Sequence, residues 1–74
     1  MAYDYSKLSG KIKEVFDTNA AFAKAMGLSE RSISSKLRGK VGWKQSEIEK
    51  ACQLLSISRS EVVEYFFNLK VHSA

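Results

Sequence analysis

Proline is absent from this chain, cysteine and histidine occur once each, and no apolar run approaches a membrane span in length. Cys52 cannot close an intramolecular disulfide alone, and one thiol with one imidazole cannot supply the ligands of a zinc site. The segment Met1 to Tyr5 has neither the basic nor the apolar region of a secretory leader. These absences exclude disulfide-stabilised and zinc-binding folds, and they predict a cytoplasmic protein with no membrane partner.

The 74 residues, 45% hydrophobic and 27% charged, match one small globular domain spanning positions 1–74. A chain of this length buries only about 60% of its unfolded surface, which leaves little room for a closed active site. The sequence shows no catalytic set. We therefore expect a binding protein rather than an enzyme, with no cofactor and no metal.

Helical periodicity and glycine stops divide the first half of the chain. The apolar residues Leu8, Ile12, Val15 and Phe16 predict one inner face of a helix over residues 6–16. Thr18 is suited to cap a second helix over 19–26 that Gly27 ends. Ser29 is suited to cap a third, which Gly39 ends and which Ile33 and Leu37 anchor.

Two more helices are expected in the second half. Residues 44–55 carry apolar residues at helical spacing, namely Ile48, Ala51, Cys52 and Leu55. Ser58 and Glu61 fit a capping box that opens a fifth helix extending through Phe67. A strand over 62–67 or 69–71 stays an alternative, because these runs are β-branched and aromatic. The predicted fold class is all-α, with five helices.

The positive charge is concentrated in the middle of the chain. The whole chain carries a net charge of +4. Residues 24–44 hold six basic residues against Glu30 alone, whereas the segments on either side are nearly balanced. Such a concentration suits a polyanionic partner. It is also compatible with a solvated surface that keeps a small protein soluble.

Residues 18–39 have the spacing of a helix-turn-helix. Ala23 is small where a second helix crosses closely, Gly27 can adopt the positive φ of a three-residue turn, and Leu28 and Ile33 can anchor the next helix. An ordinary helical hairpin with a solvated basic face would share part of this pattern.

With those anchors inward, the other side of the third helix is short-chained and basic, which suits the major groove of double-stranded DNA. The residues predicted to face base edges, or a protein partner, are Glu30, Arg31, Ser34, Ser35 and Arg38. Those predicted to contact phosphates are Asn19, Lys36, Lys40 and Lys44. We expect the Lys36 amine to extend outward from a half-buried position.

Residues 22–34, FAKAMGLSERSIS, resemble the helix-turn-helix of lambda-repressor-type and Cro-type phage regulators. Residues 1–12 and 43–52 resemble small Cro-like and modulator-of-repression proteins of temperate phages of Gram-positive bacteria. The resemblance implies a lambda-repressor-like fold and a Cro-like regulator that binds operator DNA in the lysis-lysogeny switch. It also implies an alternative, an antirepressor or modulator that binds the phage repressor protein and has weak or no DNA binding.

Three further features carry predictions. We expect Cys52 to be a small buried hydrophobe. Trp43 fits a hydrophobic staple before the fourth helix, with contact to the DNA backbone or to a partner as the alternative. Phe66, Phe67, Leu69 and Val71 supply apolar surface that could pair two copies through residues 66–74.

Overall fold

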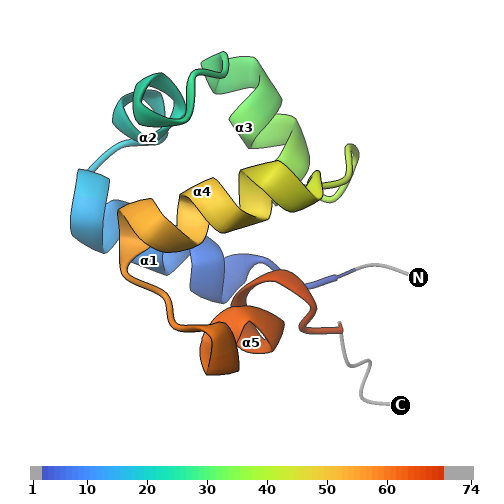
Figure 1. Cartoon of the computed structure of the whole chain (residues 1–74). Coiled ribbons are helices and arrows are strands. Elements are labelled where there is room, and N and C mark those ends of the chain that lie inside the picture. Colours follow the sequence, from blue (N-terminus) through green and yellow to red (C-terminus); the bar gives the residue numbers. More distant parts are fainter. Residues whose placement is uncertain (1–2, 70–74) are drawn as a thin grey trace.

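The computed structural model describes residues 3–69, and their secondary structure is helical (Figure 1). The elements are α1 (Ser6–Phe16), α2 (Asn19–Met26), α3 (Glu30–Leu37), α4 (Gln45–Leu55), the 3-10 helix η1 (Arg59–Glu61) and α5 (Val62–Phe66). The part of the chain described contains no β-strand, although one isolated antiparallel bridge joins Tyr3 to Leu69. The prediction of an all-α fold with five helices is confirmed.

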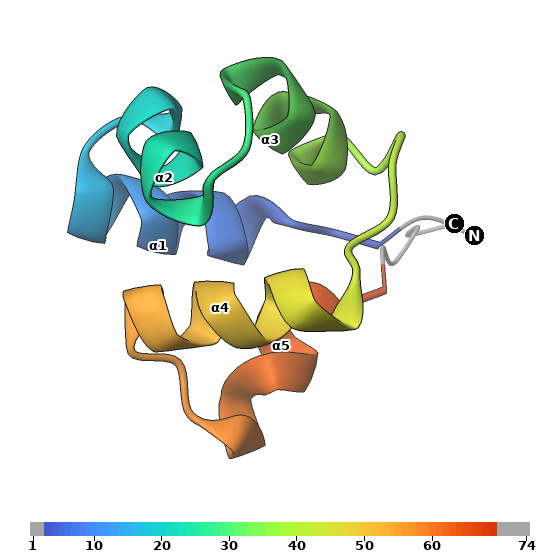
Figure 2. The same ribbon diagram turned by 45° about the horizontal axis from the view of Figure 1, so that its top comes forward.

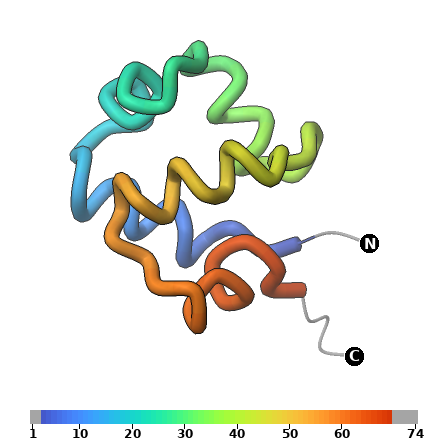
Figure 3. Tube along the Cα trace, viewed as in Figure 1, coloured from blue at the N-terminus to red at the C-terminus, as the bar shows by residue number. Residues whose placement is uncertain are grey.

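Helix α1 packs against each of the other α-helices. The tube in Figure 3 shows the chain winding around this helix, with α2 and α3 on one side and α5 on another. Every α-helix contributes to the core, whose largest fully buried side chains are Leu8, Ile12, Phe22, Ile33, Leu55 and Phe66. The predicted inner face of α1 is therefore correct for Leu8 and Ile12. It is wrong for Val15, which is 47% exposed because it lies beside the stripe that runs from Leu8 through Ile12 to Phe16.

Helix α1 ends at Asp17, whose φ is 73°, and α2, α3 and α4 end in a second, shared way that also uses a residue of positive φ. Gly27 and Gly39 have φ of 76° and 78°, a conformation that glycine adopts without steric cost, and Ser56 has φ of 56°. In each case the following N–H donates to the carbonyl five residues earlier: Leu28 to Ala23, Lys40 to Ser35, and Ile57 to Cys52, at 2.9 to 3.0 Å. These bonds satisfy carbonyls that the helix leaves open. The glycine stops predicted for α2 and α3 are confirmed.

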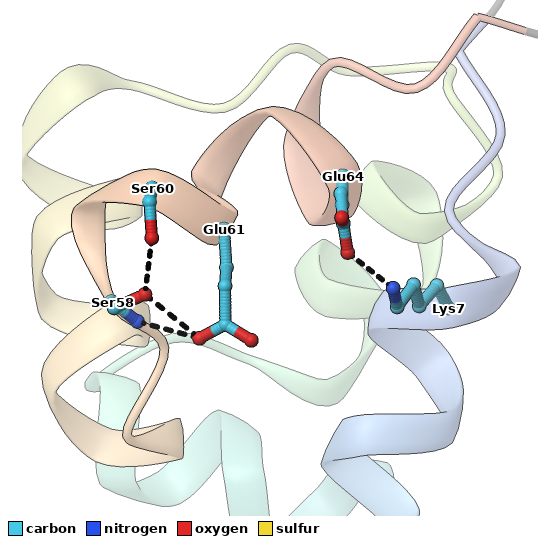
Figure 4. Close-up of polar contacts among 5 residues, drawn as sticks. All are labelled: Lys7, Ser58, Ser60, Glu61 and Glu64. Carbon is cyan, nitrogen blue, oxygen red and sulfur yellow. Dashed lines mark hydrogen bonds and ion pairs between the residues drawn. The ribbon is translucent and has the colours of Figure 1, made fainter.

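The predicted N-caps also form. The Thr18 hydroxyl accepts from the Ala21 N–H and the Ser29 hydroxyl accepts from the Ser32 N–H, both at 3.1 Å. The Ser58 N–H donates to Glu61 Oε1 at 3.1 Å, which confirms the capping pair (Figure 4). This pair begins η1, which α5 continues, so the segment that could have been a strand is helical up to Phe66. Val71 lies outside the described residues.

Helix α5 is held against α1 by a surface ion pair. Lys7 donates to Glu64 (Figure 4), and the Lys7 ammonium also lies 5.2 Å from the centre of the Tyr65 ring. The hydrogen bond to Glu64 raises the pKa of Lys7 above its ordinary value. With Phe66 in the core and this ion pair at the surface, α5 is thus attached to α1.

Candidate interface on helix α3

Helices α2 and α3 are joined by a three-residue turn, as the sequence predicts for residues 18–39. Ala23 is 2% exposed, and its small side chain lets the helices pack closely. Ile33 is fully buried, and Leu28 and Leu37 pack partly against the same core. Because these apolar residues face inward, the opposite side of α3 is left on the surface (Figure 1).

The outward side of α3 carries the predicted base-facing or partner-facing residues. Glu30, Arg31 and Arg38 are exposed, and Ser34 and Ser35 are half-buried. From Arg31 to Arg38 these positions follow the spacing that places side chains on one helical face. Neither arginine forms an ion pair with any residue in the range 3–69. The structure therefore brings the five residues to one surface with both guanidinium groups unpaired in the described chain.

Exposed cations and one amide lie before and after α3 in the chain. Lys40 and Lys44 are exposed in the segment between α3 and α4, and Asn19 is exposed at the first position of α2. Lys24 on α2 is also exposed. Around α3, positive side chains therefore outnumber Glu30, the one acidic residue of positions 24–44.

The prediction for Lys36 is wrong. This lysine is 5% exposed, and its ammonium faces inward, 2.9 Å from Glu47 Oε1 and 3.0 Å from the Gly42 carbonyl oxygen. The ammonium also lies 5.7 Å from the centre of the Trp43 ring. A carboxylate and a carbonyl inside the fold compensate the buried charge, so the amine has no need to reach solvent. Lys36 is therefore not available to a phosphate.

Glu47 is a structural residue that was not predicted from the sequence. Its Oε1 accepts both from Lys36 and, at 2.9 Å, from the Lys44 N–H that precedes α4. Burial acts to raise the pKa of Glu47, but the hydrogen bonds from Lys44 and Lys36 and the charges of both lysines outweigh it, so the pKa lies below its ordinary value. A glutamate at the third position of a helix is a sequence signal for a side chain that accepts from the N–H of the capping residue, and Glu47 occupies this position in α4.

Trp43 occupies the position predicted for a hydrophobic staple. It lies two residues before α4, and both Trp43 and Ile48 pack against the core. Its ring meets Phe66 edge-on at 5.2 Å between ring centres and Tyr5 at 6.4 Å. Its buried indole N–H has no acceptor within residues 3–69. The staple prediction fits these contacts, which place most of the ring inside the protein.

The predicted apolar surface at the end of the chain is only partly present. Phe66 is 1% exposed and belongs to the core, so it does not contribute to that surface. Phe67 and Leu69 are exposed, and Tyr3 lies against Phe67 with 5.8 Å between ring centres. Residues 70–74 of the predicted pairing segment lie outside the described residues. Cys52 is half-buried rather than fully buried, and burial raises the pKa of its thiol.

No helix among the described residues has the length and apolar character needed to cross a bilayer. No group of three or more histidine, cysteine, aspartate or glutamate side chains among residues 3–69 could hold a metal ion.

Residues 1–69 match the family model described as "Protein of unknown function (DUF739)". The chain belongs to this family. Among solved structures, the solution structure of the modulator of repression (MOR) of the temperate bacteriophage TP901-1 from Lactococcus lactis is similar to it, with 54% identity, 97% of each chain covered and a TM-score of 0.79. No curated protein matches the chain.

The DUF739 match extends over all five helices and over every residue of the α3 surface. Identity of 54% over nearly the whole of both chains means that this similarity includes sequence as well as fold. It confirms the resemblance to small modulator-of-repression proteins of temperate phages.

Proposed function

We propose that this DUF739 chain is a modulator of repression in the lysis-lysogeny switch of a temperate phage, acting in the cytoplasm of the bacterial host. The observation that carries the proposal is the 54% identity to a phage modulator of repression over 97% of both chains. A regulatory binding protein of this kind needs an exposed recognition surface. The outward face of α3, with Arg31 and Arg38 unpaired in the described chain, is the surface that we assign to this role.

The first candidate partner is operator DNA, with α2 and α3 acting as a helix-turn-helix. Short serine side chains let α3 approach the floor of the major groove while the arginines reach base edges. In this arrangement Arg31, Ser34, Ser35 and Arg38 read bases, and Glu30 can accept from a cytosine amino group. Asn19, Lys40 and Lys44 contact phosphates, and Lys36 is removed from that set because its amine is paired inside the fold.

The second candidate partner is the phage repressor protein, and the name of the Lactococcus phage relative, a modulator of repression, is compatible with it. In this case Glu30 and Arg31 form charged contacts with the repressor, and the protein acts as an antirepressor with weak or no DNA binding of its own. A carboxylate at the start of α3 suits this partner, because it repels DNA phosphates and attracts a basic protein surface.

Pairing of two copies is part of the DNA-binding candidate. Phe67 and Leu69, with Tyr3 beside them, offer exposed apolar area for such a contact. A two-fold pair would present two α3 helices to half-sites about 34 Å apart on one face of the duplex. Sedimentation of the protein with and without a selected duplex measures this directly. A single copy on an asymmetric site would overturn the pairing.

One experiment separates the partners. Purified protein is used to select duplexes from a random library at about 150 mM salt, where nonspecific attraction to phosphates is suppressed. In parallel, it is mixed with the repressor encoded by the same phage and analysed by gel filtration. An enriched motif supports operator reading, whereas a stable complex without an enriched motif supports the antirepressor. If folded protein does neither, the proposed function is wrong.

A further inference from the structure

A groove of about 740 Å³ lies between α4 and the segment formed by η1 and α5. Its apolar lining consists of Trp43, Ile48, Cys52, Ile57, Val62 and Phe67. The wall formed by α5 is held in place by Phe66, which is buried in the core, and by the Lys7–Glu64 pair to α1. Figure 2 shows α5 on the side of α4 away from α3, an arrangement that Figure 1 also shows.

The groove follows the axis of α4. The α4 residues that line it run from Gln45 through Ile48 and Cys52 to Gln53, positions that share one face of the helix. At 1.5 Å per residue this wall is about 12 Å long, a little over two helical turns. A wall of this length matches the part of an amphipathic helix that presents apolar side chains at i, i+3 or i+4, and i+7. A short helix is thus the element whose dimensions fit.

The two walls carry opposite charges. Glu49 lies on the α4 wall and Arg59 on the opposite wall, and both are exposed at the rim. Neither forms an ion pair within residues 3–69. A helix lying in the groove would complement them with a basic side chain toward α4 and an acidic side chain toward η1. This charge arrangement orients the occupant, because turning the helix about its axis would place like charges together.

We propose that the groove between α4 and α5 binds an amphipathic helix of a partner protein, with apolar anchors against Ile48, Cys52 and Val62 and an acidic side chain against Arg59. This interface is separate from the α3 surface and goes beyond the proposed function. Because the two surfaces lie on different sides of α4, a helix in the groove leaves α3 free (Figures 1 and 2). The chain then holds two partners at once, one on each surface.

The test is a selection of helical peptides from a displayed random library, with the full-length chain as the target. The selected helices should have apolar residues at the spacing above and an acid at the position that faces Arg59. Selection against Arg59→Glu should exchange that acid for a base. Arg31→Ala is the matched control on the other surface, and it should bind the selected peptides with unchanged affinity.

Cys52 provides the readout of location, because it is the one cysteine of the chain and it lines the groove. At about ten times its dissociation constant a selected peptide leaves about a tenth of the sites empty, so alkylation of Cys52 should slow about tenfold. Val62→Glu, checked for helical content by circular dichroism, should abolish both binding and this protection.

Three outcomes would overturn the proposal. The first is that folded protein enriches no helix. The second is that the selected helices leave Cys52 unprotected or keep their acid on the Arg59→Glu protein. The third is that Cys52 becomes protected with rising protein concentration and no peptide, which would mean that a second copy fills the groove. None of these three outcomes depends on duplex selection or on repressor binding. The groove proposal can therefore be overturned while the proposed function stands, and the reverse.

Discussion

Lys36 at the end of α3 and Glu47 in the first turn of α4 form an ion pair with 2.9 Å between ammonium nitrogen and carboxylate oxygen. The Lys36 ammonium also donates to the Gly42 carbonyl oxygen at 3.0 Å, and Glu47 accepts from the Lys44 N–H. One buried lysine therefore ties α3, the following loop and the start of α4 together. The pair therefore contributes to how α3 is held against the rest of the fold.

The two members of this pair should contribute unequally to stability. Glu47→Gln keeps an acceptor for the Lys44 N–H but leaves an ammonium whose side chain is only 6% exposed without its counter-charge. We expect a loss of about 3 kcal/mol in the free energy of unfolding. Lys36→Met keeps the aliphatic part of the side chain, and the Glu47 carboxylate still accepts from the Lys44 N–H. The free energy of unfolding should therefore fall by only about 1 kcal/mol. Urea denaturation of both variants measures the difference.

The double variant Lys36→Met/Glu47→Gln is the control. With both charges gone there is no unpaired buried ion, so its loss should be smaller than the sum of the two single losses. Strictly additive losses would show that the ion pair does not couple the two residues.

Stability should fall in acid because the pKa of Glu47 is lower in the folded state. Glu47 binds its proton more weakly when folded than when unfolded, since hydrogen bonds from Lys44 and Lys36 favour the carboxylate. Its contribution is therefore present above the unfolded pKa, whose ordinary value is 4.5, and is lost as pH falls through the folded pKa. We expect the denaturant concentration at the unfolding midpoint to decrease once the pH is lowered below about 4.5.

The double variant without this pair should lose less of its stability over the same acid range. Glu61 acts in the same direction, because hydrogen bonds from Ser58 lower its pKa. For this reason Glu61→Gln should also flatten the profile. A profile that is identical in the parent chain and in all these variants would mean that other carboxylates control the acid unfolding.

Helix caps and stops could be predicted from the sequence because they depend on local contacts. The caps at Thr18 and Ser29 and the stop at Gly27 depend on neighbours within a few residues, and each was predicted correctly. Lys36 was not, because the acid that lets its amine stay inside the protein belongs to the next helix. The α3 surface was predicted from periodicity alone, since burial of Ile33 decides which side faces outward.

Ser56 should be a site where glycine stabilises the protein. It ends α4 with φ of 56°, a left-handed conformation that costs a residue with a Cβ atom about 1 kcal/mol. Ser56 is exposed, so Ser56→Gly removes the strain without removing packing. We expect the free energy of unfolding to rise by up to about 1 kcal/mol, and thermal denaturation measures this.

Gly27→Ala, at φ of 76°, is the opposite control and should destabilise the protein. Lower stability of Ser56→Gly would mean that the serine side chain contributes more than the strain costs.

Trp43 should tolerate phenylalanine far better than alanine. Phenylalanine keeps an aromatic ring near Phe66 and Tyr5 and removes an indole N–H that is buried without an acceptor in the described chain. The removed polar group cost about 1 to 3 kcal/mol, which offsets the smaller ring. Trp43→Ala should lose about 3 to 5 kcal/mol in the free energy of unfolding. Equal losses for the two variants in urea would show that the aromatic contacts contribute little.

If α3 reads DNA, the Arg31→Ala and Lys40→Ala variants should lose DNA affinity in different ways. Arg31→Ala removes a side chain assigned to a base edge, so it should cost about 1 to 3 kcal/mol on the selected duplex and relax one base position. Lys40→Ala removes a phosphate contact. It should weaken binding to all sequences alike and reduce the slope of affinity against salt by about one. Both side chains are exposed and unpaired within residues 3–69, so neither change should affect folding.

Charge reversal separates the two partners at the same surface. Glu30→Lys adds positive charge at the start of α3, next to Arg31. Toward DNA it should strengthen nonspecific binding, because it replaces a repelling carboxylate with an attracting ammonium. Toward a repressor protein it should weaken or abolish the complex, because a basic partner surface would meet a like charge. Titration of Glu30→Lys with a random duplex and with the repressor therefore gives opposite signs for the two partners. Unchanged affinity for both would remove α3 from the recognition surface.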